Sequence, residues 1–197
     1  MSPRLALGAL LALVLPVGLG PGAQAQAEPT RYSLAVDVAY GAPPGPERTL
    51  RRIVENVLAR LAGTPCFASI ETVRPAPPSD LVLRVRLDDF ADVTHHEASI
   101  SERVSPNSNP IEMASRVVAT VSAQARIELR LGSEAGALVR GRSFLAAESW
   151  RPQQLEDPHA AAEERFIERL GEEVQSVACK GGATKLARAI EKARVPR

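Results

Sequence analysis

"VVATVSAQARIELRL", residues Val117–Leu131, decides the fold of this chain. Apolar residues occupy its odd positions, while its even positions after Val118 are polar or charged. A period of two sustained over such a length predicts a long β-strand with one buried side and one side in water. A sheet that is wet on one face is usually antiparallel. We therefore expect a sheet whose apolar face is covered by other parts of the same chain.

The neighbouring segments supply further strands. Downstream, 132–136 reads as a hairpin connection and 137–149 as the returning strand, while upstream 32–40 and 81–88 also alternate. Between the strands at 81–88 and 117–131, residues 89–113 lose regularity. We expect a long loop there, and extended stretches that continue the strand are the alternative for part of it. A connection of this length is often functional or mobile in a compact domain.

Two segments change to a helical period. Leu50, Ile53, Val57 and Leu61 belong to one apolar stripe that ends before Gly63, which predicts an amphipathic helix. A second helix is predicted from Asp157-Pro158 to Cys179, since Asp suits the capping position and Pro the first turn. Residues 183–197 are expected to form a basic C-terminal tail or a short helix.

The order of elements predicts an α+β fold. Its core is a mixed, mostly antiparallel sheet of about four strands, in the order strand, helix, strand, strand, strand, helix, with both helices on one face. The strand–helix–strand unit makes its two strands parallel, which brings Cys66 and Cys179 to the same end of the domain. We predict a disulfide between them, as an exported protein favours, and two separate buried thiols are the alternative.

The first residues predict export. Arg4, an apolar run over 5–17 and small residues at 22–27 form the pattern of a signal peptide over 1–27. An uncleaved anchor is the alternative, but the run is shorter than the ~20 residues needed to span a bilayer. We expect residues 28–182 to form one periplasmic domain, with secretion as the alternative location and no membrane span after cleavage.

Charge and motifs narrow the function. The mature chain has 23 basic and 23 acidic residues, which argues against binding nucleic acid. No catalytic or cofactor motif is recognisable, and neither a cofactor nor a metal site is predicted. His95, His96 and Glu97 could contribute metal ligands, but the only other histidine is His159.

The wet face of the sheet is the candidate binding surface. It is expected to carry Arg84, Arg86, Gln124, Arg126 and Arg130. A solvated face explains these residues, and a docking surface is the other interpretation, because arginine makes bidentate contacts with carboxylate and phosphate. The first hypothesis is a non-enzymatic periplasmic accessory protein that binds an envelope protein or glycolipid through this face and the 89–113 loop. The second is a small-ligand or metal-binding periplasmic enzyme that uses His95, His96 and nearby acids.

Three consecutive units carry a resemblance to known proteins. They are "DLVLRVRLDDF" (Asp80–Phe90), "ARIELRLGSEAGALVRGRSF" (Ala125–Phe144) and the helix from Pro158. In this order the chain resembles small envelope accessory proteins of Gram-negative bacteria, above all the lipopolysaccharide-assembly lipoprotein family and related uncharacterised exported domains. The resemblance implies a sheet with two helices on one face. The Cys that a lipoprotein signal places after its small residues is absent, and no functional residue is carried over.

Overall fold

The computed structural model describes residues 31–72, 79–100, 113–150 and 157–195. The predicted signal peptide, residues 1–27, lies outside the described residues. The described elements follow the chain as β1 (Tyr32–Tyr40), α1 (Glu47–Ala62), β2 (Phe67–Glu71), β3 (Leu81–Ile100), β4 (Met113–Leu131), β5 (Leu138–Trp150), α2 (Pro158–Cys179) and α3 (Gly182–Arg194). The α+β class is confirmed.

The strands form one mixed sheet in the order β2-β1-β3-β4-β5. β1 is parallel to both β2 and β3, whereas β3–β4 and β4–β5 are antiparallel. The prediction of about four, mostly antiparallel strands therefore needs correction, because the sheet has a fifth strand, β2, at its edge. β2 has only five residues, and only its first residue, Phe67, is buried. A strand this short shows no period in the sequence.

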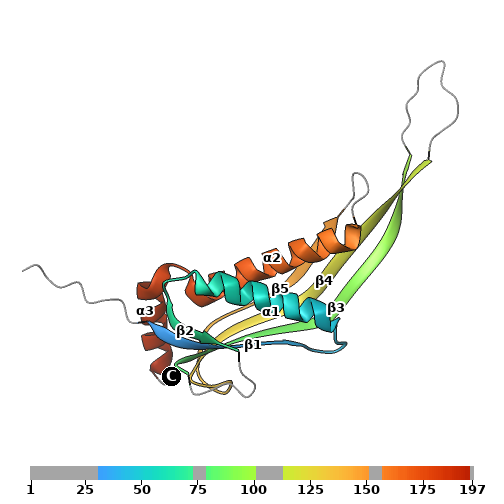
Figure 1. Ribbon diagram of the computed structural model, residues 1–197. Coiled ribbons are helices and arrows are strands. Elements are labelled where there is room, and N and C mark those ends of the chain that lie inside the picture. The colour runs from blue at the N-terminus through green and yellow to red at the C-terminus, as the bar shows by residue number, and fades with distance from the viewer. Residues whose placement is uncertain (1–30, 73–78, 101–112, 151–156, 196–197) are drawn as a thin grey trace, which may run out of the picture.

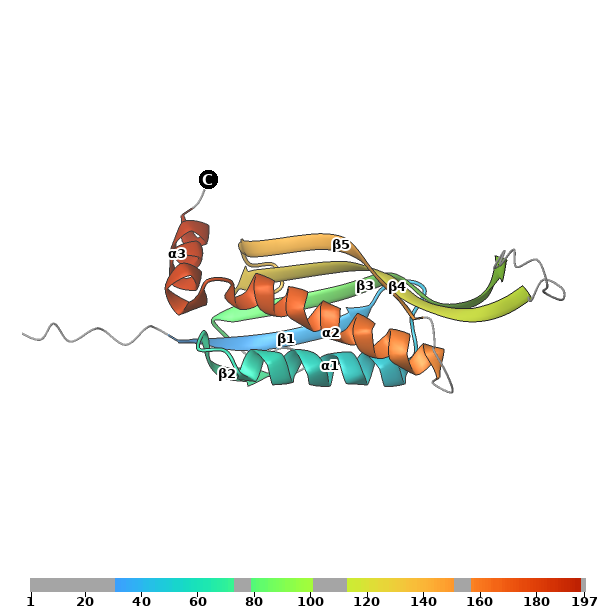
Figure 2. The same cartoon turned by 90° about the horizontal axis from the view of Figure 1, so that it is seen from above.

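α1 and α2 lie side by side over the same face of the sheet, and α3 stands at the end of the domain where β5 begins (Figures 1 and 2). Two helices were predicted on the sheet, with a tail or a short helix after them, and the structure has a third helix, α3, over Gly182–Arg194. None of the described helices is long and apolar enough to cross a bilayer.

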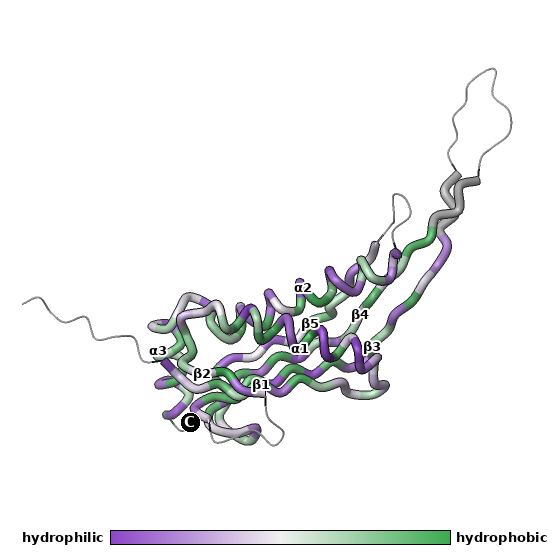
Figure 3. Tube along the Cα trace, in the orientation of Figure 1, coloured by the Kyte–Doolittle hydropathy of each residue, from purple (hydrophilic) through white to green (hydrophobic). Residues whose placement is uncertain are grey.

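The core fills the layer between the sheet and these helices. Odd-numbered residues of β4 from Ala119 to Leu129 are at most 2% exposed, as the alternation predicts. Ile53 and Leu61 of α1 and Phe166 of α2 are fully buried against the sheet. Apolar character is concentrated along the strands in the body of the domain (Figure 3). Burying each side chain of this size contributes about 1.5–3 kcal/mol.

β3 and β4 continue far beyond the helices as a two-stranded ribbon (Figure 1). Their pairing runs without a break from Ala91↔Ser122 to Ile100↔Met113. The loop expected over 89–113 therefore needs correction: residues 89–100 continue β3, as the alternative of extended stretches allowed, and 101–112 lies outside the described residues. Backbone pairing sets the strands here, and this segment lacks the one-sided burial from which a strand is recognised in sequence.

A β-bulge explains why the alternation of β3 stops where it does. The register shifts between Asp88 and Ala91, and Asp89 has a φ of 53°. Such a bulge sets two residues against one and reverses which residues of the strand face the core. Phe90 thereby turns toward the helices, with its ring centroid 5.2 Å from that of Tyr40 and 6.1 Å from that of Phe166.

Candidate functional site

Arg84 is held in ion pairs within the chain. Its Nη2 lies 3.2 Å from Glu134 Oε2 in the β4–β5 hairpin, and its Nε lies 3.8 Å from Asp37 Oδ2 of β1. Buried Nε has no hydrogen-bond partner within the described residues. These contacts fix the hairpin to the sheet, and the role of Arg84 in a binding surface stays a prediction.

Arg130 is also engaged within the chain. Its Nε donates to Glu128 Oε2 at 2.9 Å and its Nη1 donates to the Gly136 carbonyl oxygen at 3.0 Å. Since the hairpin is anchored by Arg84 and Arg130 together, one end of the sheet's open face is occupied by the protein itself. The alternating sequence could not reveal this, because a charged residue on a wet strand face looks the same whether or not an acid lies beside it.

Arg86 and Arg126 are the remaining cations predicted for this face. They are directly opposite each other on β3 and β4, and we call them the Arg86–Arg126 pair. No ion pair involves either side chain within the described part of the chain. Like charges directly opposite in a sheet are destabilising, and an acidic group from outside would relieve the repulsion. Gln124 is exposed on the same strand, opposite Asp88.

The β3–β4 ribbon adds open backbone edges to this face. We use "ribbon" for residues 91–100 of β3 and 113–118 of β4. β1 pairs with β3 only as far as Leu87, and the pairing of β5 with β4 begins at Ala119. Among the described residues, no third strand therefore accompanies the ribbon on either side. Such edges present N–H and C=O groups that can pair with another chain.

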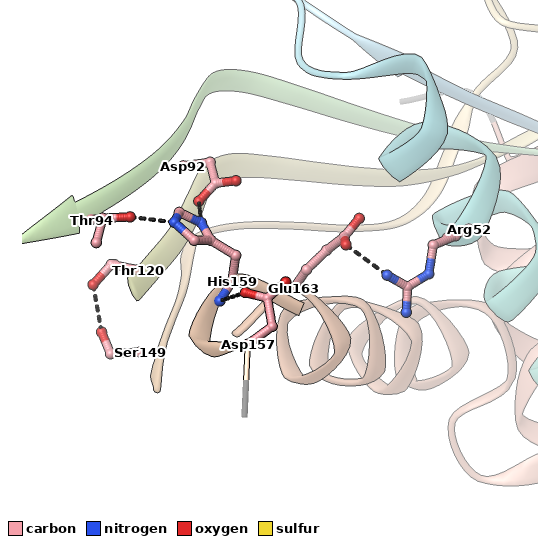
Figure 4. Close-up of polar contacts among 8 residues, drawn as sticks. All are labelled: Arg52, Asp92, Thr94, Thr120, Ser149, Asp157, His159 and Glu163. Atoms are coloured by element: carbon pink, nitrogen blue, oxygen red, sulfur yellow. Dashed lines mark hydrogen bonds and ion pairs between the residues drawn. The ribbon is translucent and has the colours of Figure 1, made fainter. Parts of the chain in front are cut away.

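A cluster of polar residues joins the base of the ribbon to α2 (Figure 4). His159 Nδ1 lies 2.8 Å from Asp92 Oδ1, and its Nε2 contacts Thr94 Oγ1. Asp157 caps the helix by accepting the His159 backbone N–H at 3.0 Å. His159 therefore fixes the first turn of α2 to the first residues of the ribbon. The sequence did not indicate this contact, because the bulge decides that Asp92 and Thr94 face the helix.

The order carboxylate, imidazole, hydroxyl is the one that activates a nucleophile in hydrolases. That chemistry also requires donors aimed at the developing oxyanion and a cavity for the substrate. Neither Thr94 nor His159 lines the pockets between β5 and α3, between β5 and the end of α2, or between α1 and α2. The side chains of His159 and Asp92 are 42% and 39% exposed. We interpret the cluster as a clamp that sets the direction of the ribbon.

The other contacts in Figure 4 strengthen this corner of the domain. Arg52 of α1 donates to Glu163 of α2 at 2.6 Å, and the hydroxyls of Thr120 and Ser149 lie 2.9 Å apart across β4 and β5. Burial and the nearby charge of Glu163 raise the pKa of Tyr40 to about 12. With the contacts of His159, these contacts join α1 to α2, α2 to β3, and β4 to β5 near the point where the ribbon begins.

His95 and His96 are exposed on the ribbon, and the side chain of Glu97 lies outside the described residues. Within the part of the chain that the structure describes, no three His, Cys, Asp or Glu side chains are grouped as metal ligands. His159 contacts Asp92 and Thr94 instead. The hypothesis of a metal-binding enzyme thus gains nothing from the geometry.

Cys66 and Cys179 form a disulfide, with their Cα atoms 6.0 Å apart. The predicted pairing is present, and it joins the segment after α1 to the last residue of α2. Both helices therefore end at the same side of the domain, as the order of elements predicted. Cys66 is fully buried.

Comparison with known proteins shows that the fold of this chain is similar to that of solved structures. No protein-family model and no curated protein matches the chain. Among solved structures, a protein described as homologous to the neuraminyllactose-binding hemagglutinin, from Helicobacter pylori, superposes with a TM-score of 0.52 at 10% identity, covering 85% of this chain and 91% of that one. Protein XCC0632 from Xanthomonas campestris, a DUF330 protein, has a TM-score of 0.48 at 13% identity over the same shares. A minor lipoprotein from Acinetobacter baumannii has a TM-score of 0.32 at 12% identity, covering 83% of this chain and 95% of that one.

All three come from Gram-negative bacteria. At such low identity the likeness concerns the arrangement of helices and strands, and the lipopolysaccharide-assembly lipoprotein family remains a prediction from the sequence. The chain thus has the fold of the Helicobacter pylori hemagglutinin homologue.

Proposed function

We propose that this chain is a non-enzymatic accessory protein of the Gram-negative cell envelope. In this proposal residues 1–27 direct export to the periplasm, and residues 28–182 with the following helix form the mature protein. Its function is to bind a partner protein through the β3–β4 ribbon and the neighbouring Arg86–Arg126 pair. The ribbon carries the proposal, because it projects beyond the helices while both of its edges lack a strand partner in the described part of the chain.

A protein partner suits these edges better than a lipid does. Strand addition supplies main-chain hydrogen bonds along an open edge and side-chain contacts at alternate positions. An isolated two-stranded hairpin is marginally stable in water, so a bound strand would stabilise the ribbon. The clamp of His159 on Asp92 and Thr94 holds the base of the ribbon in place, which lowers the entropy lost on binding.

The partner is expected to present acidic groups. Arg86 and Arg126 face each other without an acid between them, while Arg84 and Arg130 are engaged by Glu134 and Glu128. A carboxylate placed between two guanidinium groups makes charge-assisted hydrogen bonds. An envelope glycolipid, the other partner class that the sequence left open, has anionic groups but no strand to add.

Site-specific photo-crosslinking in intact cells tests the proposal. A photoreactive residue replaces Val93, which is 51% exposed on the ribbon, and the control carries it at Arg51, exposed on α1. We expect a discrete protein adduct from position 93 only. With the adduct partner purified, Arg86→Glu/Arg126→Glu should weaken direct binding about fivefold or more, as a lost pair of charge contacts does.

Arg51→Glu/Arg188→Glu is the matched control, since it reverses two exposed charges on α1 and α3. Circular dichroism of each variant verifies that it folds. Equal adducts from positions 93 and 51, binding that is indifferent to the reversal at Arg86 and Arg126, or a glycolipid adduct in place of a protein would each refute the proposal.

A further inference from the structure

A pocket with basic walls lies between β5, the end of α2 and the start of α3. Its volume is about 510 Å³. The residues that line it are Arg140, Gly141, Arg142, Ser176, Val177, Lys180 and Lys185. Four of them are cations and none is an acid. The pocket is on the helix side of the sheet, opposite the Arg86–Arg126 pair, and belongs to a different surface.

The register of β5 sets two of these cations. Arg140 is opposite Leu129 and Arg142 is opposite Ile127, so both arginines face the helix layer. Arg140 donates to the carbonyl oxygens of Lys180 at 3.3 Å and Lys185 at 3.1 Å. It therefore compensates the negative end of the α2 dipole and holds the α2–α3 turn. Burial lowers the pKa of Arg140.

The α2–α3 turn positions the lysines. Gly181 has a φ of 79°, and a Cβ on it would lie 2.3 Å from Lys185 Cδ. The turn thus leaves room for the stem of Lys185 to lie against its backbone. Lys180 and Lys185 are exposed, and no ion pair involves either lysine within the described residues. Of the four cations, Arg142 is the one with an acidic partner in the described part of the chain, Glu173.

The pocket therefore holds an excess of positive charge that its own residues do not neutralise. Arg140 has a structural explanation in the carbonyls that it caps, but that explanation does not extend to the two lysines. Phosphate suits such a group, because lysine binds it as a point charge and arginine through its fork of donors. The Ser176 hydroxyl in the lining adds a neutral donor.

An apolar groove continues from the pocket along β5 and α3. Its volume is about 540 Å³, and its lining is Ala137, Leu138, Val139, Ala189, Lys192, Ala193 and Val195. Residues 137–139 directly precede Arg140 on β5, and Ala189 follows Lys185 by one helical turn. Leu138 is 49% exposed and Val195 is 67% exposed. The basic pocket and the groove are thus consecutive along one seam.

We propose that this seam binds an amphipathic phosphate ester, with the phosphate between Lys180 and Lys185 and the apolar chain in the groove beside Val139 and Val195. This ligand site goes beyond the proposed binding of a partner protein, and its phosphate pocket lies on the helix side of the sheet. Either proposal can fail without the other.

Calorimetric titration of the full chain tests the proposal with three probes. They are inorganic phosphate, dihexanoyl phosphatidate and dihexanoyl phosphatidylcholine, the two lipids below their micelle concentrations. We expect saturable binding of phosphatidate at least tenfold tighter than that of inorganic phosphate, because only the lipid fills the groove. Phosphatidylcholine should bind at least tenfold more weakly than phosphatidate, because its phosphate is shielded by a cationic group.

Variants locate the site. Lys180→Gln/Lys185→Gln should weaken phosphatidate binding at least tenfold, while Arg188→Gln, which removes an exposed cation of α3 outside both linings, should leave it unchanged. All three substitutions are at exposed positions, and thermal unfolding checks the folding of both variants. Equal affinity for the two lipids, inorganic phosphate as tight as phosphatidate, an equal loss in Arg188→Gln, or no saturable binding of any probe would overturn the proposal.

Discussion

Removal of the Cys66–Cys179 bridge should strongly destabilise the domain. The two cysteines are 113 residues apart, so the bridge closes a long loop in the unfolded chain. The chain-entropy relation gives about 4.8 kcal/mol at 25 °C for a loop of this length. Domains of this size have a free energy of unfolding of about 5–15 kcal/mol. The bridge therefore accounts for a third or more of that free energy.

Urea unfolding of Cys66→Ala/Cys179→Ala, followed by far-ultraviolet circular dichroism, measures the effect. With a slope of about 2 kcal/mol per molar urea, the midpoint should fall by about 2 M. The thermal midpoint should fall by about 10–19 °C, at about 2–4 °C per kcal/mol. Reduced wild-type protein is the matched control, because it lacks the bridge but keeps both sulfur atoms in the core.

A loss below about 1 kcal/mol in both the variant and the reduced protein would refute this reasoning. It would mean that the unfolded chain between the two cysteines is confined by something other than the bridge. A large loss in the variant and none in the reduced protein would assign the effect to packing around Cys66, which is fully buried, and would equally contradict the loop-closure account.

Two further substitutions test the local geometry. Gly136→Ala should destabilise the protein by about 1–3 kcal/mol, because the added Cβ would lie 1.6 Å from the Leu131 carbonyl oxygen. Gly132→Asn should cost less than about 1 kcal/mol, because Gly132 has a φ of 62°, which Asn tolerates, and a Cβ there would have nothing within 4 Å. Similar urea midpoints for the two variants would contradict this. Tyr40 has its pKa raised from 10.0 to about 12, so its contribution to stability is complete below pH 10 and is lost as the pH rises toward 12. Tyr40→Phe should therefore flatten the fall in urea midpoint between pH 9 and pH 11.5, and parallel curves for the two proteins would show that Tyr40 does not govern it.

Periodicity predicted the parts of this fold that face the core. The odd residues of β4 from Ala119 to Leu129 are buried where the pattern places them, and so are Ile53, Val57 and Leu61 of the α1 stripe. The order of these elements also brought Cys66 and Cys179 together correctly. Positions that face the core recur with the period of the strand or helix, so apolar residues recur with the same period in the sequence.

Elements without one-sided burial left no such trace. β2 has five residues with a single buried side chain, Phe67. The ribbon is held by backbone pairing between β3 and β4, and backbone hydrogen bonds form whatever the side chain is. The bulge at Asp89 also reverses the phase of β3, so an alternation continued from Leu87 would assign Asp92 to the wrong face.

The candidate sites depend on contacts between residues far apart in sequence. The arginines of β3 and β4 were correctly identified as belonging to one strand face, but Glu134, the partner of Arg84, lies in a hairpin whose fold over that face has no sequence signal. On β5, Arg140 and Arg142 alternate in phase with Phe144. That spacing is a signal for a polar pocket within the helix layer, although charged positions of a strand are usually assigned to solvent.

The bulge at Asp88–Ala91 makes β3 tolerant of a change in length at this point. With Asp89 or Phe90 removed, the remaining residue would pair with Ala123, and the pleat would become continuous. Asp92 would still lie opposite Val121, so the carboxylate and hydroxyl that hold His159 would keep facing α2. Relatives that lack one residue here would therefore present the same side of the ribbon to whatever they bind, whereas a residue lost within the regular pairing beyond Ala91 would exchange the two sides.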